Sequence, residues 1–178
     1  MDSTESALHL LPLPDGAHNH RPGDIWTAGT PLLIPLGAGL STGIRRSGPD
    51  GIRELTTDDL LSEDTTVGEL WADAALTMLA TLGRISAVHG TALRQRRLTD
   101  GILEIGVIDD PFPAAGLIAH PLLVRPTLRV LPEDPRVAVT ATGRLLVVSG
   151  GADPVDCPGG VAEEVCGPAL PLSESALL

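Results

Sequence analysis

The segment 66–83 constrains the fold of this chain most, because it carries both the start signal and the periodicity of an amphipathic helix. Thr66 is followed three residues later by Glu69, the spacing of a capping box that satisfies the first free N–H groups of a helix. Gly83 is typical of the residue that follows a helix. The apolar residues between them recur at helical spacing: Val67, Leu70, Trp71, Ala74, Ala75, Met78, Leu79 and Leu82. The pattern predicts a helix with one face that other elements must cover.

The remaining apolar segments are short and favour strands. Candidate strands lie at 42–46 and 51–55 around the turn GPDG, at 102–107, and in a hairpin of 137–140 and 145–149 around Gly143. We also expect extended structure at 85–89 and 127–131. The basic cluster RQRR (94–97) is expected to be a solvated turn, and the alternative is that it binds a phosphate or an acidic partner. The sequence therefore predicts an α+β fold, in which a mostly antiparallel sheet packs against one main helix (about 66–83) and a short second helix (about 112–123).

The length of 178 residues fits one domain with a sizeable core. Residues 1–24 are rich in Pro, Gly, His and Asp and are expected to form an irregular N-terminal lead-in. Residues 25–151 are expected to form a single α+β domain. Residues 152–178 are dominated by Pro, Gly, Glu and Ser and are expected to be a loop or tail.

The net charge of −11 disfavours binding to nucleic acid, because an acidic surface repels a phosphate backbone. All twelve basic residues are Arg, a pattern typical of codon usage in a high-GC bacterium. No apolar run approaches the ~20 residues that cross a bilayer, so no membrane partner is expected. The first residues lack the basic start of a signal peptide, which predicts a cytoplasmic location. There Cys157 and Cys166 are expected to be reduced thiols, although their spacing leaves a disulfide open.

Several polar residues are candidates for chemistry. His18 and His20 are spaced to share a metal if a further ligand arrives from elsewhere. Cys157 or Cys166 could serve as a nucleophile or ligand, but the acidic surroundings disfavour a thiolate. Asp109 and Asp110 most simply end a strand and cap the next helix, and the lone histidines His89 and His120 are typical of satisfied boundary residues.

Four stretches, in this order, resemble the bacterial YtpQ-like family of unknown function: LTTDDL (55–60), GELWADAALTMLA (68–80), DDPFPAAGLIAHPLL (109–123) and DPRVAVTATGRLLVVSGG (134–151). The chain departs from that family at the turn between the last two strands. The family tends to have Pro-x-Arg-Asp there, whereas this chain has TATGR (140–144), in which only Arg144 has a counterpart. The resemblance implies an α+β fold and no established reaction.

These observations predict a non-catalytic protein-binding module, of an accessory, assembly or immunity type, that acts through a sheet face or edge. The partner is expected to be another protein or a second copy of the chain, with no cofactor, metal or catalytic residue. The interface candidates are Trp26, Phe112 and Arg144. The alternative is a small hydrolase or metal-dependent enzyme that uses His18, His20 or His120 with Cys157 or with the pair Asp109 and Asp110.

Overall fold

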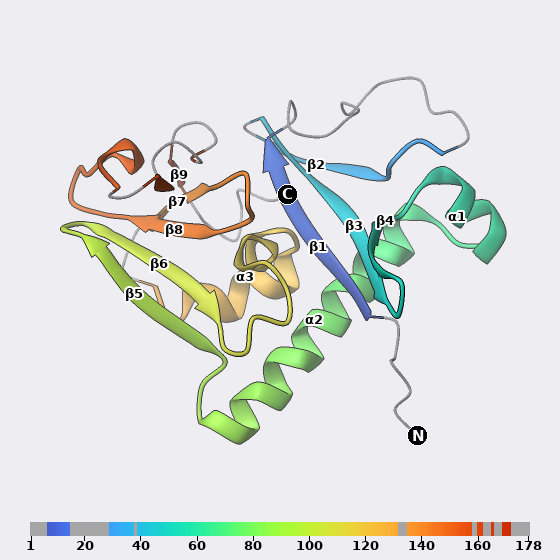
Figure 1. The fold of residues 1–178 in the computed structure, drawn as a ribbon, viewed down its shortest axis with the longest axis horizontal. Helices are drawn as coiled ribbons and strands as arrows, with labels where there is room; N and C mark the ends of the chain where they lie inside the picture. Colours follow the sequence, from blue (N-terminus) through green and yellow to red (C-terminus); the bar gives the residue numbers. More distant parts are fainter. Residues whose placement is uncertain are drawn as a thin grey trace.

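In a computed structural model of the chain, the long helix α2 (Val67–His89) packs against the first sheet and shares a buried core with the second (Figure 1). The predicted capping box is confirmed: the Glu69 N–H donates to Thr66 Oγ1 at 3.2 Å, and the Thr66 N–H donates to Glu69 Oε2 at 2.9 Å. The helix continues through Gly83 and ends at Gly90, which has a left-handed φ of 78°. The extended structure expected at 85–89 is therefore wrong, because Gly90 rather than Gly83 adopts the left-handed conformation that stops a helix.

The structure describes residues 7–14, 29–37, 39–131, 135–157, 160–161, 165 and 169–171. Within them, the first sheet contains four antiparallel strands: β1 (Ala7–Pro14), β2 (Leu33–Gly37), β3 (Leu40–Gly48) and β4 (Gly51–Glu54). Strand β3 pairs with each of the other three. Strand β1 lies in the segment 1–24 that was expected to be irregular, so that expectation is wrong. Its prolines Pro12 and Pro14 are compatible with a strand because β1 pairs with β3 alone and does not need every N–H for a ladder.

The second sheet contains five antiparallel strands: β5 (Leu93–Thr99), β6 (Ile102–Val107), β7 (Arg136–Val139), β8 (Leu145–Val148) and β9 (Leu170–Pro171). Their order is β5-β6-β8-β7-β9. The β7–β8 hairpin and the strand at 102–107 are confirmed. The turn predicted at 94–97 is wrong, because these residues form the middle of β5. All four are exposed, so the strand lacks the alternation of apolar and polar residues by which a strand is recognised.

The short helices differ in place from the prediction. The helix expected at about 112–123 is a 3₁₀ turn, η1 (Ala114–Ile118), followed by helix α3 (Pro121–Leu128). The strand expected at 127–131 is absent, because Thr127 lies in α3 and its hydroxyl donates to the Leu123 carbonyl at 2.7 Å. Asp109 and Asp110 do not cap a helix, since Pro113 is the N-cap of η1. The other short helices are α1 (Thr57–Glu63) and η2 (Pro154–Asp156).

Helix α1 is tied to the first sheet by a carboxylate. Asp59 accepts two hydrogen bonds from the Arg53 guanidinium, at 2.7 and 2.9 Å, and one from the Thr56 N–H at 2.8 Å. These bonds, led by that from Arg53, lower the pKa of Asp59 to about 2. The side chain therefore stays ionised at any ordinary pH, and it joins β4 to the first turn of α1.

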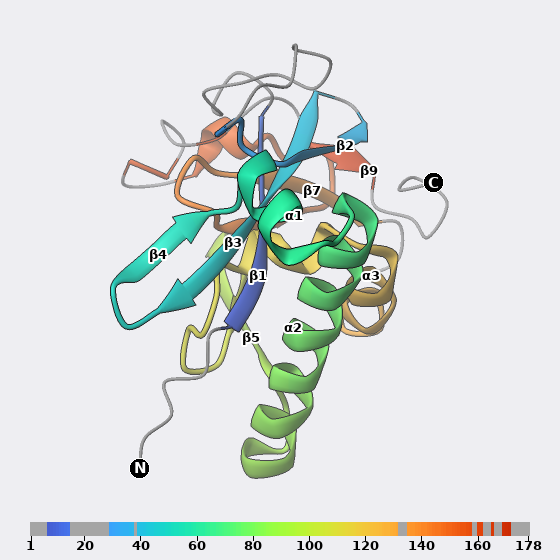
Figure 2. The same cartoon turned by 90° about the vertical axis from the view of Figure 1, so that its right-hand side faces the viewer.

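The two sheets share one core with α2, η1 and α3. Leu10 of β1, Met78 of α2 and Val147 of β8 belong to the same buried cluster, and Figure 2 shows α2 running beneath the strands. Side chains on a strand alternate between faces, so Leu146 and Val148 of β8 point to the opposite side. There they pack against Cys157, Val161 and Ala169. Part of the segment expected to be a loop or tail therefore covers the outer face of the second sheet.

These observations confirm the predicted α+β fold, with antiparallel sheets, one long helix and shorter ones. In the part of the chain that the structure describes, no helix is both long and apolar enough to cross a membrane.

Candidate functional site

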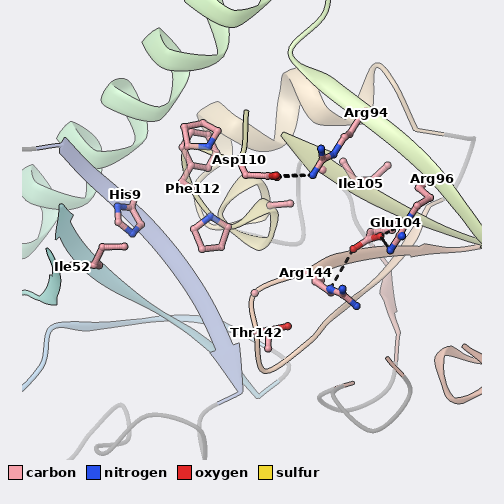
Figure 3. A pocket seen from close by; sticks show the side chains of 15 residues that line it. His9, Ile52, Arg94, Arg96, Glu104, Ile105, Asp110, Phe112, Thr142 and Arg144 are labelled. Carbon is pink, nitrogen blue, oxygen red and sulfur yellow. Dashed lines mark hydrogen bonds and ion pairs between the residues drawn. The ribbon is translucent and has the colours of Figure 1, made fainter. Parts of the chain in front are cut away.

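A cavity of about 720 Å³ opens where the outer face of the second sheet meets β1 and β4 of the first (Figure 3). Figure 3 shows His9 and Ile52 on one side, Arg94, Arg96, Glu104 and Arg144 on the other, and Phe112 between them. The lining thus combines charged groups on the strands with an apolar surface. Both kinds of surface come from segments that lie far apart in the sequence.

The register of β5 and β6 places the charged groups. Arg94 lies opposite Gly106 and Arg96 lies opposite Glu104, so alternation puts all four positions on one face. A Cβ atom at Gly106 would lie 2.6 Å from Arg94 Nε. Any larger residue at position 106 would therefore displace the Arg94 side chain, which here crosses β6 to reach Asp110.

Three guanidinium groups face two carboxylates in this cavity. Arg94 Nη2 lies 2.7 and 2.8 Å from the two carboxylate oxygens of Asp110. Arg96 Nε donates to Glu104 Oε2 at 2.8 Å, and Arg144 Nε lies 3.4 Å from Glu104 Oε1. Glu104 is therefore held between two arginines. The five groups leave one net positive charge, on a chain whose net charge is −11.

His9 is the most deeply buried polar group that lines the cavity. It is only 3% exposed, and its Nε2 atom has no hydrogen-bond partner within the described residues. Its Nδ1 atom lies 3.4 Å from the Ser47 hydroxyl. Burial, and to a smaller extent the positive charge of Arg45, lowers the pKa of His9. The imidazole is therefore neutral at neutral pH, and its Nε2 atom is enclosed by protein.

Two of the three residues predicted for an interface lie at this cavity. Phe112 and Arg144 come from different loops and both line it, whereas Trp26 lies outside the described residues. Whether they contact a partner stays a prediction. Sequence reasoning did not assign a site role to Glu104 or His9, and it weighed one for Arg96 only as part of the basic cluster at 94–97. The basic cluster at 94–97 was a usable signal, but its pairing with β6 depends on a register that composition does not reveal.

The residues of the enzyme alternative that the structure describes lie on separate elements. His120 caps α3, accepting from the Leu122 N–H at 3.1 Å, and packs its ring against Trp71 with centroids 4.5 Å apart. Cys157 lies in the cluster that covers the outer face of the second sheet, the face that also carries Glu104, and burial, then Asp156 and Glu104, raise the pKa of its thiol. Asp110 pairs with Arg94, and Asp109 lies 3.4 Å from His89.

His18, His20 and Cys166 lie outside the described residues. Among the residues that the structure does describe, no three His, Cys, Asp or Glu side chains are grouped so that they could hold a metal ion.

Comparison with known proteins finds no family model, no curated protein and no solved structure that matches this chain. The resemblance to the YtpQ-like family stays a prediction from the four stretches alone.

Proposed function

We propose that this chain is a non-catalytic protein-binding module, and that the outer edge of β5 receives an extended acidic segment of another protein. The observation that carries the proposal is the free edge of β5. Within the described residues no strand pairs with that edge, because β5 is the first strand of its sheet and bonds to β6 alone. An extended segment that adds to such an edge gains main-chain hydrogen bonds along its length.

The register identifies the backbone groups that such a segment would use. The Ile108 N–H donates to the Ala92 carbonyl at 2.9 Å, which fixes the phase of the antiparallel ladder. Alternation then directs the backbone groups of Arg94 and Arg96 toward β6, and those of Gln95 and Arg97 away from it. The N–H and carbonyl of the next outward residue, Leu93, already bond to the Thr91 hydroxyl. Gln95 and Arg97 therefore offer the groups for pairing.

Charge supports an acidic partner. Residues 94–97 are exposed and include three arginines, of which Arg94 and Arg96 pair with Asp110 and Glu104. The Arg97 side chain is 74% exposed, and its Nη1 atom lies 3.8 Å from Asp100 Oδ1, so it is the arginine most open to an acidic partner. A second copy of β5 paired along this edge would bring arginines next to arginines, which is unfavourable. An acidic strand would meet them with opposite charge. The edge thus disfavours its own copy and favours an acidic segment.

The test is a selection of random peptides displayed on phage, with the whole chain as bait. We expect acidic sequences to be enriched. An Arg97→Pro variant removes one outward N–H and leaves every bond to β6 in place, so it should weaken the selected peptides at least tenfold. The matched Arg97→Ala variant keeps the N–H and should bind more tightly than Arg97→Pro. Circular dichroism checks that each variant is folded.

If Arg97→Pro does not fold, Arg97→Glu takes its place, since it reverses the charge without restricting the backbone. The proposal fails if no peptide is enriched, if the enriched peptides are basic or neutral, or if they bind the Arg97→Pro or Arg97→Glu variant as well as the parent chain.

A further inference from the structure

We propose that the cavity between the two sheets binds a carboxylate group that is carried on an apolar body. This site shares the side chains of Arg94 and Arg96 with β5 but does not use the outward backbone groups of its edge, and the rest of its lining comes from β6, from residues 110–114 and 142–144, and from His9 and Ile52 of the first sheet. It goes beyond the proposed protein-binding function and does not depend on it.

The charge of the lining favours a monoanion. Arg94, Arg96 and Arg144 carry three positive charges, and Asp110 and Glu104 carry two negative ones. His9 adds no charge, because it is neutral. A single carboxylate would bring the site to neutrality. A phosphate monoester, with a charge of about −1.5 to −2, would leave it negative and would bind less well.

Arg144 supplies the donors for that carboxylate. Its only ion pair with the described residues runs from Nε to Glu104 at 3.4 Å, and no hydrogen bond there engages its two terminal nitrogens. Its backbone is fixed, because the Arg144 N–H donates to the Thr140 hydroxyl at 3.0 Å. A planar guanidinium with free terminal N–H groups matches the two oxygens of a carboxylate. The neighbouring arginines are engaged more closely, at 2.7 to 2.8 Å.

The rest of the lining fits an apolar body. Pro111 and Pro113 form an apolar surface on either side of Phe112, which is itself only 7% exposed, and Ile52 lies across from them and is 63% exposed. A ligand that covers Ile52 removes apolar surface from water, which is favourable. The volume of about 720 Å³ is that of a small-molecule site or of one that takes the end of a chain.

The experiment measures binding of two acids to the whole chain by isothermal titration and ligand-observed NMR. 3-Phenylpropionate represents a free small molecule, and N-acetyl-leucyl-leucine represents a peptide C-terminus. The controls are the corresponding amides, which lack the charge, and phenethyl phosphate, which carries more of it. Binding by one acid alone identifies the source of the carboxylate, and binding by either supports the site.

We expect at least one acid to bind with a dissociation constant below about 1 mM, and the amides to bind at least tenfold more weakly. Arg144→Gln should weaken the acid at least tenfold. Arg84→Gln is the matched control, because it removes an exposed arginine of α2 that does not line the cavity, and it should leave the affinity unchanged.

Four results would overturn the proposal: no binding by either acid, equal binding by an amide, tighter binding by phenethyl phosphate, or an Arg144→Gln variant that binds as the parent does. A failure here leaves the edge of β5 untouched, since Arg97→Pro changes the edge and Arg144→Gln changes the cavity.

Discussion

At the scale of single residues, His9 stands out because it is a polar side chain buried among apolar ones. It lies on β1 between apolar neighbours, is almost wholly buried, and leaves Nε2 unpaired within the described residues. A buried polar atom without a partner costs about 1–3 kcal/mol. The positive charge of Arg45 further disfavours the protonated ring. The residue therefore reduces the stability of the free chain, and reduces it more as the pH falls.

The sign of the pH effect follows from the lowered pKa. Because burial lowers the pKa of His9 in the folded chain, the unfolded chain takes up a proton at His9 more readily than the folded chain as the pH falls through 6.5. Stability should therefore fall as the pH drops through 6.5. We expect His9→Phe to raise the free energy of unfolding by about 1 kcal/mol at pH 7.5. Between pH 7.5 and pH 5 the variant should lose less free energy of unfolding than the parent chain, as measured by urea unfolding.

His120, whose pKa burial also lowers, contributes a fall of the same sign in both chains. The difference between parent and variant in how the free energy of unfolding changes with pH therefore reports the contribution of His9. Parallel loss of stability in the two chains would show that His9 does not carry the effect.

The same scale shows how far the sequence predicts the site. Phe112 was singled out as the only Phe of a chain poor in aromatic residues, and Arg144 as the one residue of its turn with a counterpart in the family that the chain resembles. His9 was not found, because its role arises from the packing of β1 beside the loop at Phe112, a contact between segments about a hundred residues apart. Arg96 was visible as part of a basic cluster, but its partner Glu104 is set by strand register.

At the scale of elements, two glycines of helix α2 have different roles. The helix tolerates Gly83 in its interior, and it needs Gly90 at its end. Gly83 lies inside the helix, is exposed, and has open space where a Cβ would be. Gly90 ends the helix with φ +78°, and its N–H donates to the Ser86 carbonyl at 2.8 Å. Alanine restricts the unfolded backbone in both places but fits the folded conformation at position 83 alone.

We therefore expect Gly83→Ala to raise the free energy of unfolding by about 0.5–1 kcal/mol and Gly90→Ala to lower it by about 1 kcal/mol. Thermal and urea unfolding of the two variants beside the parent measures this. Destabilisation by Gly83→Ala would mean that the helix does not run continuously through that position.

The elements that were predicted correctly are those with local signals. The capping box of α2 and the β7–β8 hairpin are each contained in fewer than twenty consecutive residues. Strand β1 was missed because its prolines argue against a strand and its partner β3 lies some thirty residues away. The second helix was placed too early, since the prolines at 111, 113 and 121 each suit a helix start and only the cap at His120 selects one.

At the scale of the whole molecule, the cavity depends on how the two sheets meet. The turn between β7 and β8 reaches the first sheet: a Cβ at Gly143 would lie 2.7 Å from Leu11 Cδ1 on β1 and 2.8 Å from Pro113 Cβ. The Gly143 carbonyl also accepts from the Ala115 N–H at 2.9 Å, which fixes η1 to the same turn. One glycine thus sets the distance between the two sheets, and Arg144 follows it directly.

Gly143→Ala should therefore affect stability and binding together. The residue has φ +80°, so alanine would adopt an unfavourable backbone conformation and would also press against Leu11 and Pro113. We expect a loss of about 2–3 kcal/mol in the free energy of unfolding, together with weaker binding of the carboxylate probes, because the turn must move and Arg144 must move with it. Gly150→Ala is the matched control: Gly150 has φ +63° but no atom within 4 Å of its Cβ position, so it carries the backbone cost of about 1 kcal/mol without the contacts. Equal losses in the two variants would mean that the turn does not support the space between the sheets, and the cavity would then owe its shape to residues 110–114 alone.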